Sequence, residues 1–176
     1  MSTGSAVPAT DNAAAPAAPP AAWAAYAACV WGLIFAAISF YWGSGGRHGL
    51  DTIGGSIERM ALAGDTSIFI AVWATGLLKV AGAVLALALV RPWGRRLPRR
   101  PVTLLGWFAA ILLTLYGGLL VLGDALAASG VLKSSKPIDW KPLLWHLWVW
   151  DMSFFIWGLL FAVALWRFRR ISRSAG

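Results

Sequence analysis

Two ionisable residues stand inside long apolar stretches of this chain, where a charge is costly. Lys79 lies within residues 66–90, and Asp151 lies within residues 143–166. An ammonium at the centre of a bilayer costs about 2.5–3.5 kcal/mol or more, so such a group usually finds a partner, a water-filled cavity or a ligand. We therefore expect Lys79 and Asp151 to form a buried ion pair. That pair either fixes the register of the helices or sets the polarity of a binding pocket.

Other polar side chains are expected at a similar depth. A rise of ~1.5 Å per residue from the outer boundary places Asp151 roughly 12 Å deep and Lys79 roughly 18 Å deep. These depths favour a polar pocket that opens toward the outside, with Lys79 at its floor. The candidate ligand-binding residues are Lys79, Asp151, Thr75, Tyr116, His146, Tyr41, Trp42 and Arg47.

Motifs for catalysis or metal binding are scarce. A set made of Ser153, His146 and Asp151 would have to converge from around one helix, on which His146 and Asp151 are about 140° apart. His48 and His146 fall on the same side of the membrane, but no H-E-x-x-H pattern accompanies them. Cys29 is the only cysteine. We therefore assign no catalytic residue, no metal ligand and no cofactor, and we favour a protein that is not an enzyme.

Composition places the chain in a membrane. Of its 176 residues, 59% are hydrophobic and 12% are charged, whereas a soluble domain is roughly 25% charged. Each of four apolar stretches is long enough to cross a hydrocarbon core of ~30 Å. The predicted fold class is all-α, an integral membrane four-helix bundle. Its membrane domain covers residues 21–170, with spans at about 21–42, 67–90, 102–123 and 143–166.

The formal net charge of +8 follows from the predicted topology. Five arginines lie in the link from Arg91 to Arg100, and four more follow the last span. Because positive residues accumulate on the inner side, both termini are expected in the cytoplasm, in a multi-pass protein of the plasma membrane. We expect anionic lipid headgroups to be the partners of the Arg91–Arg100 loop, and we expect no binding to nucleic acid.

Several shorter segments have their own predicted roles. Residues 1–20 are rich in Ala and Pro and lack Lys and Arg, which predicts a disordered cytoplasmic tail. Residues 171–176 form a short basic tail, and residues 56–63 have the pattern of an interfacial helix. Gly32 and Gly158 each begin a small-xxx-small step, which favours close helix packing. That packing is expected within the chain, in a homo-oligomer or with a partner membrane subunit.

Three segments resemble a known family. They read YWGSGGRHG and LDTIGG over residues 41–55, LVRPWGRRLP over residues 89–98 and WDMSFFIWGLLF over residues 150–161. In these patterns the chain resembles domain-of-unknown-function family 3995, a family of small four-span bacterial membrane proteins. The resemblance covers nearly the whole chain after the first 20 residues. It implies four helices and leaves the activity open.

The leading functional hypothesis is a small integral membrane protein that binds an apolar or lipid-like molecule in an outer-half polar pocket. Lys79 and Asp151 would set the polarity of that pocket, and residues 41–49 would form part of a lid. The alternative is a membrane enzyme acting on a lipid or isoprenoid substrate, with Lys79 or Asp151 as acid or base. A third reading is an accessory subunit of a membrane assembly.

Overall fold

The computed structural model describes residues 22–132 and 137–174, which are mainly helical and contain no strand. Four helical runs are long and apolar enough to cross a membrane, so the predicted all-α four-span architecture is confirmed. The long helices are α1 (Ala22–Gly43), α3 (Thr66–Ala88), α4 (Arg99–Ala128) and α6 (Asp151–Ser174). The shorter elements are η1 (Leu50–Thr52), α2 (Gly55–Leu62), η2 (Pro92–Arg96), α5 (Trp140–Trp145) and the π-helical η3 (His146–Trp150).

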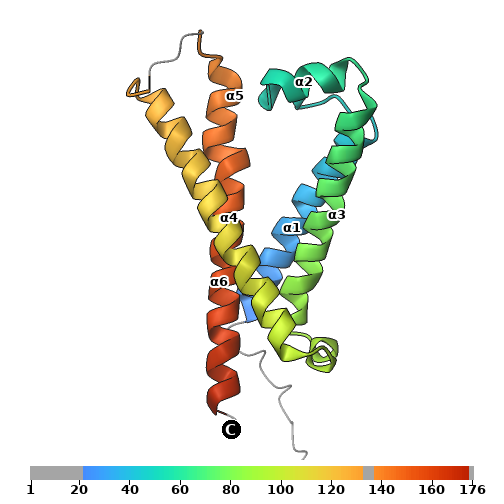
Figure 1. The fold of residues 1–176 in the computed structure, drawn as a ribbon, viewed down its shortest axis with the longest axis vertical. Helices are drawn as coiled ribbons and strands as arrows, with labels where there is room; N and C mark the ends of the chain where they lie inside the picture. The colour runs from blue at the N-terminus through green and yellow to red at the C-terminus, as the bar shows by residue number, and fades with distance from the viewer. Residues whose placement is uncertain (1–21, 133–136, 175–176) are drawn as a thin grey trace, which may run out of the picture.

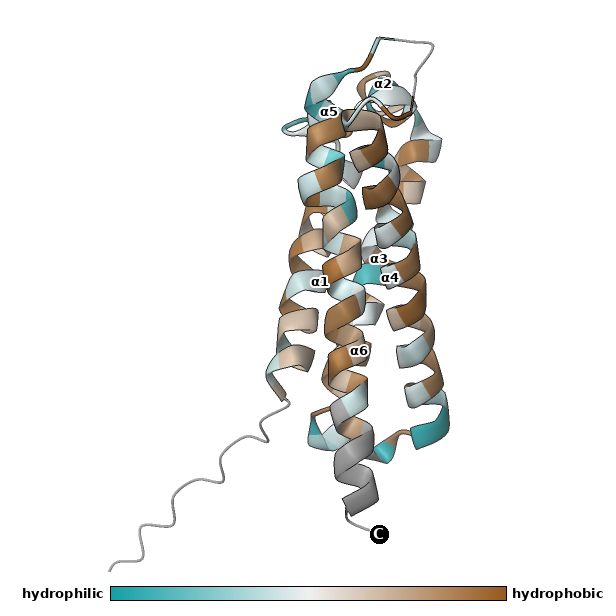
Figure 2. Ribbon diagram, turned by 90° about the vertical axis from the view of Figure 1, so that its left-hand side faces the viewer, coloured by the Kyte–Doolittle hydropathy of each residue, from teal (hydrophilic) through white to brown (hydrophobic). Residues whose placement is uncertain are grey.

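The long helices form two hairpins, one of α1 with α3 and one of α4 with α6 (Figure 1). The hairpins cross near one end of the molecule and diverge toward the other. We call the first the arginine end, because η2 and the start of α4 lie there. The opposite end carries η1, α2 and α5, and we call it the loop end. Hydrophobic residues cover most of the length of the long helices, and hydrophilic residues gather toward both ends (Figure 2).

Local sequence signals set where α2 ends and α3 begins. After α2 the chain turns at Gly64, whose φ of 75° is readily adopted only without a side chain. The next residue, Asp65, caps α3, because its Oδ1 accepts hydrogen bonds from the Ser67 backbone N–H at 2.8 Å and the Ser67 hydroxyl at 2.7 Å. The helix predicted over residues 56–63 is thus observed one residue earlier, as α2.

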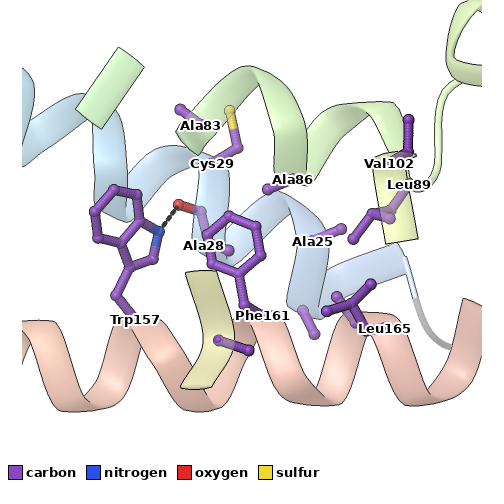
Figure 3. Close-up of a cluster of buried hydrophobic side chains, with 13 residues drawn as sticks. Ala25, Ala28, Cys29, Ala83, Ala86, Leu89, Val102, Trp157, Phe161 and Leu165 are labelled. Atoms are coloured by element: carbon purple, nitrogen blue, oxygen red, sulfur yellow. Dashed lines mark hydrogen bonds between the residues drawn. The ribbon is translucent and has the colours of Figure 1, made fainter. Parts of the chain in front are cut away.

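The hydrophobic core joins α6 to the first hairpin toward the arginine end. Trp157, Phe161 and Leu165 project from α6, and Phe161 and Leu165 are fully buried (Figure 3). The indole Nε1 of Trp157 donates to the Ala28 carbonyl oxygen at 2.8 Å. Small side chains of α1 and α3 complete the cluster, namely Ala24, Ala25, Ala28, Cys29, Ala83 and Ala86. Large residues of α6 therefore fill the space that small residues leave on the other hairpin.

Two glycines allow the close approach of neighbouring helices. A Cβ added to Gly32 would lie 2.6 Å from the ring of Trp157, and one added to Gly158 would lie 3.0 Å from the Ala110 carbonyl oxygen. Both distances are shorter than a normal contact, so neither position has room for a side chain. Gly32 therefore lies in close contact with α6, and Gly158 lies in close contact with α4. Close helix packing was the prediction for both glycines.

Some predicted boundaries differ from the observed ones. The third span was predicted to end at residue 123, but α4 continues to Ala128, because Gly123 keeps a helical backbone and the chain turns only at Gly130, whose φ is 76°. The predicted basic tail over residues 171–176 is helical as far as Ser174, because α6 continues that far. The tail predicted over residues 1–20 lies outside the described residues.

Candidate functional site

Lys79 lies within α3 and extends its ammonium toward α1. Its Nζ donates to Ser39 Oγ at 2.7 Å, and Ser39 Oγ donates in turn to the Phe35 carbonyl oxygen at 3.1 Å. Nζ also lies 6.0 Å from the centroid of the Phe154 ring, at the outer limit of a cation–π contact. An ammonium carries three donors, yet within the described part of the chain its one hydrogen-bond acceptor is this neutral hydroxyl.

The ion pair predicted between Lys79 and Asp151 is not formed by these two described side chains. The carboxylate of Asp151 instead contacts His146, with 3.1 Å between Nδ1 and Oδ2. Asp151 is also close to Asp124 of α4. The prediction was wrong because the depth of a residue along its helix does not give the direction in which its side chain points.

The π-helical segment η3 brings His146 and Asp151 together. In an α-helix, residues five apart point about 140° away from each other, and for that reason their contact was not expected. A π-helix bonds each residue to the fifth one along, so its wider turn aligns side chains at this spacing. The expectation was wrong because the sequence around residues 146–150 carries no clear signal for a π-helix.

Both ring nitrogens of His146 face oxygen atoms. Nδ1 faces Asp151 Oδ2 and Nε2 faces the Ile53 carbonyl oxygen, each at 3.1 Å. The neutral ring donates from one nitrogen, whereas the imidazolium form donates from both. The imidazolium form therefore satisfies both contacts, and His146 links the second hairpin to the loop that follows α1.

Asp124 completes a cluster of three ionisable groups. One ligand atom each from Asp124, His146 and Asp151 lies within 4.8 Å of the others. Asp151 is only 5% exposed, and Asp124 Oδ2 is shielded from solvent with no hydrogen-bond partner among the described residues. Asp124 was missed because the third span was predicted to end at Gly123. The helix-forming residues that follow Asp124, ALAA over residues 125–128, were the signal that could have found it.

The first loop is held against the second hairpin close to this cluster. The indole Nε1 of Trp150 donates to Thr52 Oγ1 at 3.2 Å. Asp51 and Lys141 form an exposed ion pair. The hydrogen bond from the Lys141 ammonium is the main cause that lowers the pKa of the Asp51 carboxyl. We call these contacts the loop clasp. It consists of Asp51 with Lys141, Thr52 with Trp150, Ile53 with His146, and Gly54 with Pro142.

Three of the predicted site residues lie in the last turn of α1 or in the loop that follows it. Tyr41 Oη accepts from the His48 backbone N–H at 3.2 Å, and Trp42 Nε1 donates to the His48 carbonyl oxygen at 2.9 Å. Both aromatic residues therefore hold the conformation of the loop. Arg47 is exposed on its surface.

The two remaining predicted residues stand on opposite hairpins. Thr75 is exposed and donates to the Val72 carbonyl oxygen of its own helix at 2.8 Å. Tyr116 packs edge-on against Phe154, with ring centroids 5.5 Å apart. Since Phe154 also faces Lys79, Tyr116 is near the predicted floor of the pocket, whereas the hydrogen bond of Thr75 is local.

A groove of about 280 Å³ lies between α1 and the segment where η3 continues into α6. Its walls are mainly apolar and include Trp31, Ile34, Phe35, Trp148, Met152 and Ile156. Ser153 also lines it, but its hydroxyl donates to the Val149 carbonyl oxygen. The groove is therefore suited to an aliphatic or aromatic surface rather than to a polar molecule.

Comparison with known proteins finds one family. The family described as Protein of unknown function (DUF3995) matches residues 30–161. This range runs from α1 into α6 and includes Lys79, the Asp124–His146–Asp151 cluster and the loop clasp. No curated protein and no solved structure matches the chain.

Proposed function

The chain belongs to the DUF3995 family, and from that premise we propose that it is a membrane protein that binds a lipid-like molecule. The ligand is an amphiphile with an apolar body and an acidic or carbonyl head. It binds in the half of the bundle nearer the loop end, and residues 41–49 form part of the lid over it.

The hydrogen bonding of Lys79 is the observation that carries this proposal. A charge at mid-membrane is costly, and its usual compensation is a carboxylate or a water-filled cavity. The ammonium here has Ser39 Oγ as its acceptor, and the Asp151 carboxylate contacts His146 instead. An acidic or carbonyl head would accept from the remaining N–H groups and offset the cost of desolvation.

The apolar groove supports the same proposal. Phe35 lines the groove, and its carbonyl oxygen accepts the hydrogen bond of Ser39, which is the acceptor for Lys79. The ammonium and the groove are thus connected through one turn of α1. An amphiphile that bonds Lys79 with its head would lay its body along this helix.

Native mass spectrometry of the protein in mild detergent tests the proposal. We expect a reproducible added mass on the wild type, its loss in Lys79→Met and its retention in Lys79→Arg. Arg59→Met is the matched control, because Arg59 is an exposed cation of α2. A bare wild-type chain, or an added mass that Lys79→Met keeps, would rule out this site.

Two other functions remain candidates for the same chain. A membrane enzyme acting on a lipid or isoprenoid substrate is favoured by the contact of His146 with Asp151, an imidazole and a carboxylate suited to acid–base chemistry. Its variants would retain substrate and lose turnover. An accessory subunit is favoured by the broad exposed apolar surfaces of α3 and α4, and it would be unstable without its partner.

The orientation of the bundle belongs to the same proposal. The arginine end lies on the cytoplasmic side of the plasma membrane, where the Arg91–Arg100 loop contacts anionic headgroups. Cysteine labelling with a membrane-impermeant reagent in intact cells, in a Cys29→Ala background, tests this arrangement. A cysteine at exposed Ser56→Cys should react, whereas one at exposed Arg96→Cys should not. The reverse pattern would invert the topology.

A further inference from the structure

We infer that Asp124, His146 and Asp151 form a binding site for one divalent transition-metal ion, such as Zn²⁺ or Mn²⁺. The three residues come from α4, η3 and α6, so the site would join both helices of the second hairpin to the π-helical turn. Neither Lys79 nor the apolar groove takes part. The inference therefore stands apart from the proposed lipid-binding function.

The geometry is close to that of a metal site. Donor atoms of the three residues lie within 4.8 Å of one another. Ligands about 2.0–2.2 Å from a zinc ion lie roughly 3–4 Å from each other, so only a small contraction is required. One imidazole nitrogen with two carboxylates suits Zn²⁺ or Mn²⁺, whereas Ca²⁺ and Mg²⁺ favour oxygen ligands throughout.

Among the described residues, one carboxylate oxygen of the cluster has no hydrogen-bond partner. Asp124 Oδ2 is shielded from solvent and accepts no hydrogen bond within the described ranges. A buried polar atom left in this state costs free energy. Two carboxylates beside one imidazole also leave the cluster with an excess of negative charge when both are ionised. A bound cation would satisfy the oxygen and offset that charge.

The contact between His146 and Ile53 supplies independent support. Metal-binding histidines usually donate their second N–H to a carbonyl or carboxylate oxygen, which fixes the orientation of the ring. Here Nε2 faces the Ile53 carbonyl oxygen at 3.1 Å, and Nδ1 faces the Asp151 carboxylate at the same distance. The incoming cation would replace the proton on Nδ1, and that proton would leave to solvent.

Equilibrium dialysis of the full chain in detergent against Zn²⁺, followed by elemental analysis, measures the site directly. We expect about one zinc ion per wild-type chain and an affinity at least about tenfold lower in Asp124→Asn. Asp65→Asn is the matched control, because Asp65 is an exposed carboxylate near the same end. It should bind zinc as the wild type does. Mn²⁺ is tested in parallel by electron paramagnetic resonance.

Other outcomes of this experiment would overturn the inference. Zinc that His48→Gln removes and Asp124→Asn keeps would be an adventitious ion on an exposed histidine. Absence of both Zn²⁺ and Mn²⁺ uptake by the wild type would exclude the site. If Asp124→Asn fails to fold, thermal unfolding of the wild type and of His146→Gln replaces it as the test. Saturating Zn²⁺ must raise the thermal midpoint of the wild type and must leave that of His146→Gln unchanged.

Discussion

The two ends of this bundle are built in different ways. Toward the arginine end, Phe161 and Leu165 are fully buried against the alanines of the first hairpin. Toward the loop end the hairpins diverge, and the contacts between them include the hydrogen bond of Trp150 with Thr52 and the ion pair of Asp51 with Lys141. The packed core at the arginine end is sensitive to any change in side-chain volume. At the loop end the hairpins are joined in part through polar groups. The buried core thus lies toward one end of the bundle, and the Asp124–His146–Asp151 cluster lies toward the other.

Removal of a large core side chain should give the largest effect. Phe161→Ala leaves a cavity at a fully buried position, for which we expect a loss of about 3–5 kcal/mol in the free energy of unfolding. Phe108→Ala is the control, since Phe108 is 64% exposed on α4. Reversible unfolding in mixed micelles measures both variants. Similar losses for the two would contradict the placement of the core.

Adding a large side chain where two helices are in close contact should have the next largest effect. Gly158→Leu places a side chain against Ala110 and Thr114 of α4, and such overpacking costs about 1–3 kcal/mol. Gly123→Leu adds the same side chain where no atom lies within 4 Å. The same unfolding assay should show a loss for the first variant alone. A stable Gly158→Leu would mean that α4 and α6 are farther apart than described.

The loop clasp should respond weakly and locally. Thr52→Val removes the acceptor for Trp150 Nε1, and a lost hydrogen bond of this kind costs about 1 kcal/mol. We expect faster amide exchange over residues 49–54 and no change near Phe161. Thr75→Val is the matched control, because the hydroxyl of Thr75 bonds only within its own helix. Faster exchange throughout the bundle would show that the two ends unfold together.

The smallest expected effect concerns the cap of α3. Hydrogen bonds from Ser67 hold the pKa of Asp65 below its usual value of 3.8. A lowered pKa in the folded state stabilises the protein above the unfolded pKa, and this contribution disappears as the pH falls through the folded value. The thermal midpoint of the wild type should therefore fall toward that of Asp65→Asn between about pH 5 and pH 3. A constant difference over that range would rule out this titration.

The sequence predicted the elements of the fold better than their contacts. Apolar length alone located the four spans, because a bilayer core imposes a minimum helix length. The glycines of the small-xxx-small steps were also recognisable, since close packing of helices requires small residues. Both signals are local, so they do not depend on how the chain returns upon itself.

The candidate site depended on features that are not local. Depth along a helix placed Lys79 and Asp151 in one layer, but the direction of each side chain decided that Ser39 and His146 were their partners. The approach of Asp124 required two further facts, that α4 continues past residue 123 and that η3 is a π-helix. Spacing along the sequence assumes a regular helix, and the site lies where that regularity ends.

The π-helical turn also bears on how this protein can change by inheritance. Such a turn holds one more residue than an α-helical turn would need, so loss of a single residue from 146–150 would restore regular helix. After loss of any one of residues 147–150, His146 would precede Asp151 by four residues, a spacing that places two side chains on the same face of an α-helix. Trp157 and Phe161 would keep their places in the core. Gain or loss of one codon could thus change the type of helix at this turn while both the pairing of His146 with Asp151 and the core are kept.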